Sequence, residues 1–281
     1  MWVRKGGVKR FLSTFVAAAV VATLAASSGT AATTTRQFGS YAGSASVSAN
    51  WSGYTLQDIN AVGLQFTSIT GTWTVPVTKC QIGTTASAAF WVGLGGSSDT
   101  STGLEQTGTG VDCTGNSNVP RYFAWYEILP ASSVEVPLKV KPGDQITTSV
   151  NVNGTTVLVQ IKNRTRKTSF TKALQVAAPD LSSAEWIAEA PSACTSSGRC
   201  TIVPLANFGT VTFTRAASIA SSHPGTINDT TWASDAIRLV PQSSSGFFAA
   251  RNSASTAGAT PGALSADGRS FPVSWLANAM P

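Results

Sequence analysis

The sequence has 281 residues, of which 42% are hydrophobic and only 11% are Asp, Glu, Lys or Arg. The formal charge of +6 comes largely from one end, because the first 32 residues contain four Lys or Arg and no Asp or Glu. Without those residues the count is 15 basic against 13 acidic side chains, and no basic run is interleaved with aromatic residues. The charge balance therefore excludes a nucleic-acid partner.

Residues 1–32 have the pattern of a secretory signal peptide. The four basic residues precede an apolar run from Phe11 to Ala26, and small residues follow this run. Polar residues interrupt the run, so cleavage after Ala26, or after Ala31 or Ala32, fits better than a membrane anchor. We expect a secreted, extracellular protein that has no membrane association after this segment is removed.

The rest of the chain predicts one all-β domain. Residues 33–45 are small and polar without periodicity, which indicates a disordered lead-in or a short pro-segment. Residues 46–281 contain short runs rich in Val, Ile, Thr and aromatic residues, separated by Gly, Pro, Asn and Asp, as in a sandwich or barrel. No stretch of ten or more residues has a helical period. The predicted strands are 48–56, 69–76, 87–96, 103–111, 121–130, 134–140, 144–152, 155–164, 168–176, 184–191, 211–219, 236–241 and 269–276.

Three connections have recognisable turn chemistry or composition. NVNGTTV at 151–157 carries Asn-Gly between two β-rich runs, which predicts a hairpin. KPGDQ at 141–145 is a Pro-Gly turn. The segment 243–267 is rich in Ser, Ala and Gly, and we interpret it as a long surface connection before the final strand.

Four cysteines in an exported chain predict two disulfides, for which three pairings are possible. Cys194 and Cys200 flank the turn-like run TSSGR, so we interpret them as one pair, which leaves Cys80 to pair with Cys113. A zinc site is the weaker interpretation, because there is no CxxC spacing and the single histidine, His223, lies in a loop-like run. We expect no metal and no cofactor.

The stretch SSAEWIAEAP at 182–191 places two glutamates in a run that otherwise reads as a buried strand. Successive strand side chains point to opposite faces, so Glu185, Ile187 and Glu189 share one face and Trp186 lies on the other. Glu189 is at the strand end, where we expect solvent to reach it. Because an isolated strand glutamate usually faces water, Glu185 becomes a candidate only if other functional residues converge on it.

A glutamine raises the same question in GLEQTG at 103–108. By the same alternation Leu104, Gln106 and Gly108 line one face, and Glu105 lies on the opposite face. The glycine leaves open space on the face of Gln106, so a ligand backbone could approach there.

Aromatic residues recur beside glycines and glutamates. Trp125 and Glu127 share a face in RYFAWYEILP, while Trp51 and Trp91 lie beside glycines in NWSGY and FWVGLGG. Eight tryptophans placed in this way indicate a cleft lined with flat surfaces. A single strand tryptophan is more often part of the core, so this interpretation also depends on convergence.

The runs NWSGY, ITGTWTVP, FWVGLGG, LEQTG, AWYEILP, AEWIAEAP and LANFGTVTFT, in this order, resemble the glutamic peptidases, also called eqolisins or peptidase family G1, in a bacterial-type secreted form. The resemblance covers about residues 46–277. It implies a concanavalin-like or lectin-like β-sandwich of two bent antiparallel sheets, with a substrate cleft on the concave face. It also implies a monomeric, secreted acid endopeptidase that acts on polypeptides.

The resemblance places the family's catalytic glutamine on Gln106 and its catalytic glutamate on Glu185. A carboxylate can take a proton from water and later return it to the departing amine, and an amide can stabilise the oxyanion. Neither step needs histidine, and a carboxylate of raised pKa works in acid. The residues that the resemblance assigns to substrate binding and support are Trp51, Trp91, Trp125 and Glu127.

This chain departs from the family pattern at three cleft positions. Gly95 stands where many members have an aspartate, Gly110 replaces a second aspartate, and Phe123 replaces another acid. Fewer cleft carboxylates bear on the pH optimum and the substrate preference, but they leave the catalytic pair unchanged.

Two other functions remain to be tested on the same scaffold. A glycoside hydrolase would use Glu185 with Glu127 or Glu189 as paired carboxylates, with tryptophans as sugar platforms, and would not need Gln106. A carbohydrate-binding module without activity is the third possibility, because a fold alone does not give a function. A serine peptidase is disfavoured, since His223 would have to be the base and no GxSxG run exists.

Overall fold

The computed structural model describes residues 35–37, 47–58, 62–97, 101, 103–195, 199–241 and 256–279. These residues form nineteen strands and no helix. The first eight strands are β1 (Thr35–Gln37), β2 (Val47–Ser48), β3 (Trp51–Gln57), β4 (Phe66–Thr74), β5 (Thr85–Gly95), β6 (Leu104–Thr114), β7 (Arg121–Ile128) and β8 (Val134–Val136). The next six are β9 (Gln145–Asn153), β10 (Thr156–Asn163), β11 (Thr168–Gln175), β12 (Ser183–Glu189), β13 (Ser192–Cys194) and β14 (Cys200–Ile202). The last five are β15 (Thr210–Ala220), β16 (His223–Gly225), β17 (Ala233–Leu239), β18 (Gly258–Pro261) and β19 (Phe271–Leu276).

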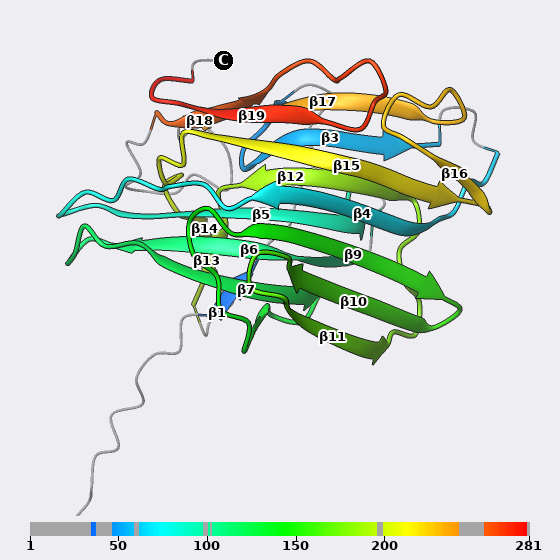
Figure 1. Cartoon of the computed structure of the whole chain (residues 1–281), viewed down its shortest axis with the longest axis horizontal. Helices are drawn as coiled ribbons and strands as arrows, with labels where there is room; N and C mark the ends of the chain where they lie inside the picture. The colour runs from blue at the N-terminus through cyan, green and yellow to red at the C-terminus, as the bar shows by residue number, and fades with distance from the viewer. Residues whose placement is uncertain are drawn as a thin grey trace, which may run out of the picture. The chain divides into compact units, whose positions relative to one another are not determined.

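The large strands form one hydrogen-bonded path that folds into two layers (Figure 1). One layer has the order β11-β10-β9-β4-β15-β19-β18-β17, and the other continues from β17 as β3-β12-β5-β6-β7-β8. Strands of the two layers that are not hydrogen-bonded to one another are in contact, among them β4 with β5 and β6 with β10. The all-β class and the antiparallel pairing of the long strands are therefore confirmed.

The burial patterns explain why the two layers differ. In β9, β10 and β15 buried and more exposed residues alternate, so one face of this layer meets the core and the other meets solvent. In β12 every residue is buried, and β5 and β6 are buried at all positions but one. Both faces of the second layer are thus covered, one by the core and one by a separate aromatic cluster.

The main core lies between the layers and is rich in aromatic residues. Trp73 and Phe213 pack with ring centroids 5.4 Å apart, and Phe213 stacks on Phe271 at 5.2 Å. Trp186 belongs to this core and donates its indole N–H to the carbonyl of Thr70 at 2.8 Å. The buried indole is therefore both packed and hydrogen-bonded.

The turn predictions are confirmed. Asn153 pairs with Thr156 across the β9–β10 hairpin, and Gly154 takes the positive φ that this tight turn requires. The Pro-Gly turn before β9 is closed by a hydrogen bond from the Asp144 amide to the Lys141 carbonyl at 3.1 Å.

Both predicted disulfides are present, Cys80–Cys113 and Cys194–Cys200, and no cysteine in the chain is free. The second closes the short β13–β14 hairpin. A third strand, β1, pairs with β13 in the same small sheet, and it lies within the segment 33–45. The predicted signal peptide at 1–32 lies outside the described residues, and the chain divides into the units 1–31 and 32–281.

The composition of the Ser, Ala and Gly-rich segment 243–267 predicted one long connection, and this prediction is wrong. β18, at Gly258–Pro261, lies inside this segment and pairs with β17 and β19. Small residues fit here because a Cβ on Gly258 would lie 2.2 Å from the Leu239 carbonyl oxygen. Among the described residues, no helix has the length and apolarity to cross a membrane.

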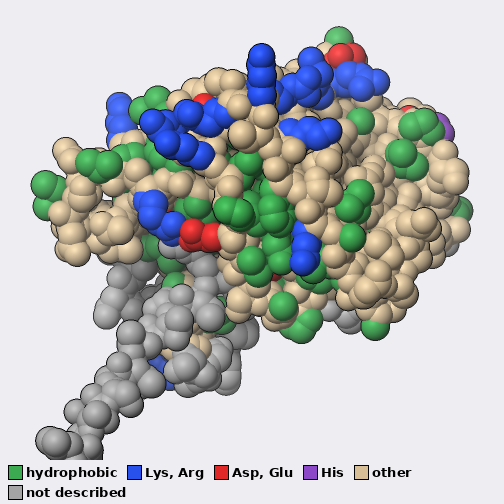
Figure 2. All heavy atoms as spheres, turned by 60° about the horizontal axis from the view of Figure 1, so that its bottom comes forward, with side chains coloured by type: hydrophobic (Ala, Val, Ile, Leu, Met, Phe, Trp, Pro, Cys, Tyr) green, Lys and Arg blue, Asp and Glu red, His purple; other side chains and the backbone are tan. Residues whose placement is uncertain are grey.

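Positive charge is concentrated on one part of the surface. Figure 2 shows Lys and Arg side chains spaced along one side of the molecule with few acidic side chains between them. The segment 139–172 has one acidic residue, Asp144, which is buried and forms an ion pair with Arg166 at 2.6 Å. Its exposed basic residues are Lys139, Lys141, Lys162, Arg164, Arg166, Lys167 and Lys172.

Candidate active site

The strand register brings the two predicted catalytic residues into one row across the second layer. Glu185 of β12 pairs with Gly93 of β5, and Gly93 pairs with Gln106 of β6. Gln106 pairs in turn with Glu127 of β7. Directly paired residues of antiparallel strands point to the same face of a sheet. Glu185, Gln106 and Glu127 therefore share one face, although Glu185 and Gln106 are far apart in the sequence.

Gly93 separates the two catalytic candidates. Neighbouring strands are about 4.8 Å apart, so the backbones of Glu185 and Gln106 are roughly 10 Å apart. A Cβ on Gly93 would lie 2.9 Å from the Trp91 ring and 3.2 Å from the Gln106 Cβ. Only glycine fits this position without moving one of the two neighbours.

The predicted alternation of faces is confirmed for both strands. On β12, Ile187 lies in the aromatic cluster of the site face, whereas Trp186 lies in the core between the layers. On β6, Leu104 lies in the aromatic cluster and Val111 lies in the core.

The three predicted tryptophans converge on the same face. Trp51, Trp91 and Trp125 belong to the aromatic cluster of the site face and are fully buried. The rings of Trp51 and Trp91 meet edge to face with centroids 5.0 Å apart. We expected an open cleft on this face, but Glu185, Gln106 and the three tryptophans are all fully buried in this structure. A substrate could therefore reach the catalytic candidates only if the atoms that cover them move apart.

Gln106 is held by a glutamate. Its side-chain Nε2 donates a hydrogen bond to Glu127 Oε2 at 2.8 Å, and both side chains are fully buried. An amide nitrogen carries two hydrogens, and this bond uses one of them. Glu127 thereby sets the orientation of the Gln106 amide and turns its NH₂ group toward the site face.

Glu189, which strand alternation places on the face of Glu185, supports one of the tryptophans. Its carboxylate accepts a hydrogen bond from the Trp91 indole at 2.8 Å and another from Asn50 Nδ2 at 2.9 Å. The expectation that solvent reaches Glu189 is wrong, because β3 and β5 flank it to the end of β12 and its side chain is fully buried. Two donors distant in sequence from Glu189 fix its role, so no local signal could have indicated it.

Glu185 has an unusual environment for a carboxyl group. It is fully buried, and neither of its oxygens has a hydrogen-bond partner. Burial raises the pKa of Glu185 well above its ordinary value, and the negative charges of Asp180 and Glu105 add to the effect. The nearby Ser183 hydroxyl lowers the pKa of Glu185, although it does not form a hydrogen bond of ordinary geometry with the carboxyl group.

The three departures from the family pattern have structural counterparts. The Phe123 ring lies against Gly110, where a Cβ would be 2.3 Å from the ring, and Arg121 covers that ring at 4.7 Å. Gly95 has φ of 79°, and a Cβ there would lie 2.5 Å from the Cβ of Asp180. The side chain of Asp180, from the segment before β12, therefore occupies the space beside Gly95.

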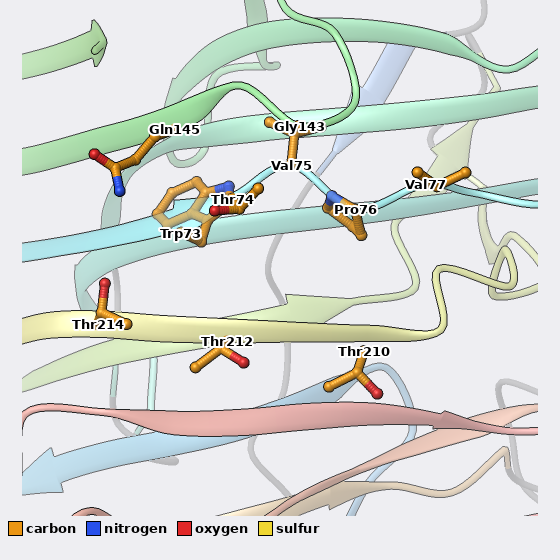
Figure 3. A pocket seen from close by; sticks show the side chains of 10 residues that line it. All are labelled: Trp73, Thr74, Val75, Pro76, Val77, Gly143, Gln145, Thr210, Thr212 and Thr214. Carbon is orange, nitrogen blue, oxygen red and sulfur yellow. The ribbon is translucent and has the colours of Figure 1, made fainter. Parts of the chain in front are cut away.

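A pocket of about 430 Å³ opens elsewhere, on the outer side of β4 and β15 (Figure 3). Threonines 210, 212 and 214 project toward it from β15, and Gln145 borders it from β9. None of its lining residues is an acid, a base or a cysteine, so it cannot carry general acid–base chemistry.

The single histidine, His223, does not belong to the candidate active site. It is exposed on β16, and its side chain is hydrogen-bonded to Asp229 at 3.0 Å. Among the described residues no group of three His, Cys, Asp or Glu side chains could hold a metal ion.

Comparison with known proteins identifies relatives of the whole domain. The model of the Peptidase A4 family matches residues 49–246. The crystal structure of scytalido-glutamic peptidase with a transition-state analogue inhibitor aligns with a TM-score of 0.62 at 24% identity, over 81% of this chain and 98% of that chain. SCP-B, a member of the eqolisin family bound to the tripeptide Ala-Ile-His, aligns with a TM-score of 0.59 at 23% identity, with the same coverage. Aspergilloglutamic peptidase from Aspergillus niger aligns with a TM-score of 0.51 at 25% identity, over 68% of this chain and 99% of that chain. Comparison with curated proteins found no significant match.

Proposed function

Because this chain belongs to the Peptidase A4 family and so hydrolyses peptide bonds, we propose that it is a secreted acid endopeptidase with Glu185 and Gln106 as its catalytic pair. Its substrates are polypeptides. Two disulfides fit an extracellular protein, which supports secretion. The two packed antiparallel layers support the finer assignment of a concanavalin-like sandwich of bent sheets, and we propose that the enzyme is a monomer.

The environment of Glu185 is the observation that carries this proposal. A buried carboxyl group with two unsatisfied oxygens is costly, because buried polar atoms in folded proteins nearly always have partners. Such a group with a strongly raised pKa is typical of a residue retained for chemistry. Its oxygens face the same side of the sheet as Gln106, so a water bound between them would complete the site.

In the proposed reaction the ionised Glu185 removes a proton from a water molecule, whose oxygen attacks the carbonyl carbon of the substrate. The new C–O bond places negative charge on the carbonyl oxygen, and the Gln106 amide donates a hydrogen bond to it. Loss of one such donor typically costs about 3 to 4 kcal/mol of transition-state stabilisation. The protonated Glu185 then gives its proton to the substrate nitrogen as the C–N bond breaks. This step leaves an acid, an amine and the ionised Glu185.

Glu127 and the tryptophans have supporting roles in this proposal. Glu127 uses one hydrogen of the Gln106 amide, so the other can be directed at the oxyanion. Trp51, Trp91 and Trp125 supply apolar walls for the substrate chain and exclude water from the reacting atoms. Glu189 positions Trp91 through the indole hydrogen bond.

The raised pKa of Glu185 determines the expected pH profile. Only the ionised form is a base, and a raised pKa means that this form is lost at a higher pH than for an exposed glutamate. The acid limb of activity should therefore have its midpoint above 4.5, the ordinary value for this group. The optimum should therefore lie at a higher pH than for an enzyme whose base is an exposed glutamate.

The glycosidase alternative is less well supported by the contacts. Glu127 gives one carboxylate oxygen to Gln106, and Glu189 gives both of its oxygens to Asn50 and Trp91. Glu189 would have to break its two bonds before it could act as the paired carboxylate for Glu185.

Hydrolysis assays separate the proposed peptidase from its alternatives. Casein and β-glucan should be incubated with the mature protein from about pH 3 to pH 8, beside the Gln106→Ala and Glu185→Gln variants. We expect casein cleavage that both substitutions abolish and no glucan cleavage. Glucan hydrolysis that survives Gln106→Ala would establish the glycosidase instead. Binding without hydrolysis in every variant would indicate a carbohydrate-binding module.

A further inference from the structure

A second buried carboxyl group lies directly behind the proposed catalytic pair. Glu105 precedes Gln106 on β6, so its side chain points to the opposite face, into the space between the layers. It is fully buried, and its cross-strand neighbours are the apolar Leu94 on β5 and Ile128 on β7. The proposed mechanism does not use this group, and neither of its cross-strand neighbours carries a charge that could compensate it.

The Glu105 side chain accepts a hydrogen bond from the segment that leads into the strand of Glu185. Its Oε1 accepts the backbone N–H of Asp180 at 3.4 Å, while its Oε2 has no partner. Asp180 lies three residues before β12, the strand that carries Glu185. Since β5 separates β6 from β12 in the sheet, this contact links β6 to the segment that leads into β12.

The segment around Asp180 is otherwise tied down on several sides. Asp180 accepts a hydrogen bond from the Ser101 hydroxyl and another from the Ser182 amide at 3.0 Å. The Leu181 carbonyl accepts the Phe66 amide at 2.8 Å. Glu105 therefore contacts a segment that other bonds also hold, so a change at Glu105 would be passed to β12 and not absorbed by a loose loop.

The protonation state of Glu105 decides whether its burial is favourable. Burial, with a contribution from the charge of Asp180, raises the pKa of Glu105 to about 8, against the opposing effect of the Asp180 amide. Among the described residues the charged groups that act on it are Asp180 and, through its own titration, Glu185. The neutral acid can be buried here, whereas the carboxylate would be a buried charge that one amide donor does not compensate.

We propose that Glu105, as a neutral carboxylic acid, is a positioning residue that sets the spacing between Gln106 and Glu185, and that its ionisation disables the site. Ionised Glu105 would be an uncompensated buried charge, and the packing around it, which includes the segment before β12, would have to open to let water reach it. The inference rests on the proposed function, because it assumes that Glu185 and Gln106 must be held in register for catalysis.

Two substitutions distinguish positioning from a structural role. Glu105→Gln keeps the shape and the acceptor but cannot ionise, so we expect activity within about twofold of wild type at the optimum. Glu105→Leu removes the acceptor while keeping the burial apolar, so we expect kcat to fall about tenfold to a hundredfold with KM unchanged. Since Leu removes an unsatisfied polar group, its thermal stability should be at least that of wild type. Glu135→Gln, an exposed carboxylate paired with Arg121, is the matched control and should change neither quantity.

The dependence of thermal stability on pH supplies an independent readout that does not need peptidase activity. We expect wild type and Glu135→Gln to lose thermal stability as pH rises from the ordinary glutamate value of 4.5 to about 8, and Glu105→Gln to lose markedly less. A stable Glu105→Leu variant with wild-type kcat would overturn the positioning role. A loss in Glu105→Gln over this pH range equal to that of wild type would overturn the role of ionisation. Absence of peptidase activity in wild type, with the melting differences intact, would refute the proposed function and leave the Glu105 contact standing.

Discussion

Replacing Glu185 should abolish activity and increase stability, which is the opposite of what a structural residue would do. Both carboxylate oxygens are buried without partners, and leaving a buried polar group unsatisfied costs about 1 to 3 kcal/mol. Glu185→Leu removes that cost at similar volume, so we expect a gain of about 1 to 3 kcal/mol in unfolding free energy. For a domain of this size the gain corresponds to a rise in Tm of about 2 to 10 °C.

The gain in stability from Glu185→Leu should depend on pH. The pKa of Glu185 is raised in the folded protein, so the folded state binds its proton more tightly than the unfolded state. Wild-type stability from this group is therefore greatest at acid pH and falls as pH rises above the unfolded pKa toward the folded one. Leu does not titrate, so the difference in Tm between Glu185→Leu and wild type should be larger at about pH 8 than at about pH 4.

Calorimetric or fluorescence melts of the mature protein at the two pH values test this reasoning, with casein hydrolysis measured on the same samples. Glu135→Gln again serves as the control, because it removes an exposed carboxylate that should contribute little. A Glu185→Leu variant that is less stable than wild type at both pH values would show that Glu185 stabilises the fold. Substantial residual hydrolysis in the same variant would remove Glu185 from the mechanism.

Three further predictions concern the framework of the site. Gly93→Val should lower stability by about 1 to 3 kcal/mol and reduce kcat, because even a Cβ would lie 2.9 Å from the Trp91 ring; Gly154→Ala in an exposed turn is a control that should leave kcat unchanged. Burial alone would raise the pKa of Asp144, but its bonds from Arg166 and other donors lower it, so the stability it adds is present above the unfolded pKa and is lost as pH falls through the folded one. Asp144→Asn should therefore lower Tm at neutral pH, and this difference should shrink in acid; a constant difference would contradict the assignment. Replacing Cys80 and Cys113 by serines should lower the unfolding free energy by about 4 kcal/mol, because that disulfide has a sequence separation of 33. The same change at Cys194 and Cys200, with a separation of 6, should lower it by about 2 kcal/mol, and denaturant titration measures both losses.

Local patterns predicted much of the fold. Alternating hydrophobicity located the long strands, and the Asn-Gly pair located the β9–β10 turn, because both signals depend on neighbours within a few residues. The same alternation placed Glu185 and Gln106 each on the correct face of its own strand. Short strands such as β13 and β18 were missed, since their three and four residues carry too little pattern.

The relation between strands could not be predicted from local patterns. The row that joins Glu185, Gly93 and Gln106 depends on the register of three strands, and a shift of one residue would turn one side chain to the other face. The burial of Glu189 and of Glu105 likewise depends on partners from remote segments, such as Asn50 and Asp180. For the catalytic pair the family resemblance supplied the long-range information that alternation lacks.

The most direct test of the central claim is a double-mutant cycle on the proposed pair. kcat/KM should be measured on one peptide substrate for wild type, Glu185→Gln, Gln106→Ala and the double variant. If the two side chains act on one water and one carbonyl group, each single change should reduce kcat/KM at least about a hundredfold, and the double variant should be little worse than the poorer single variant. Either single variant retaining half of the wild-type activity would contradict the account.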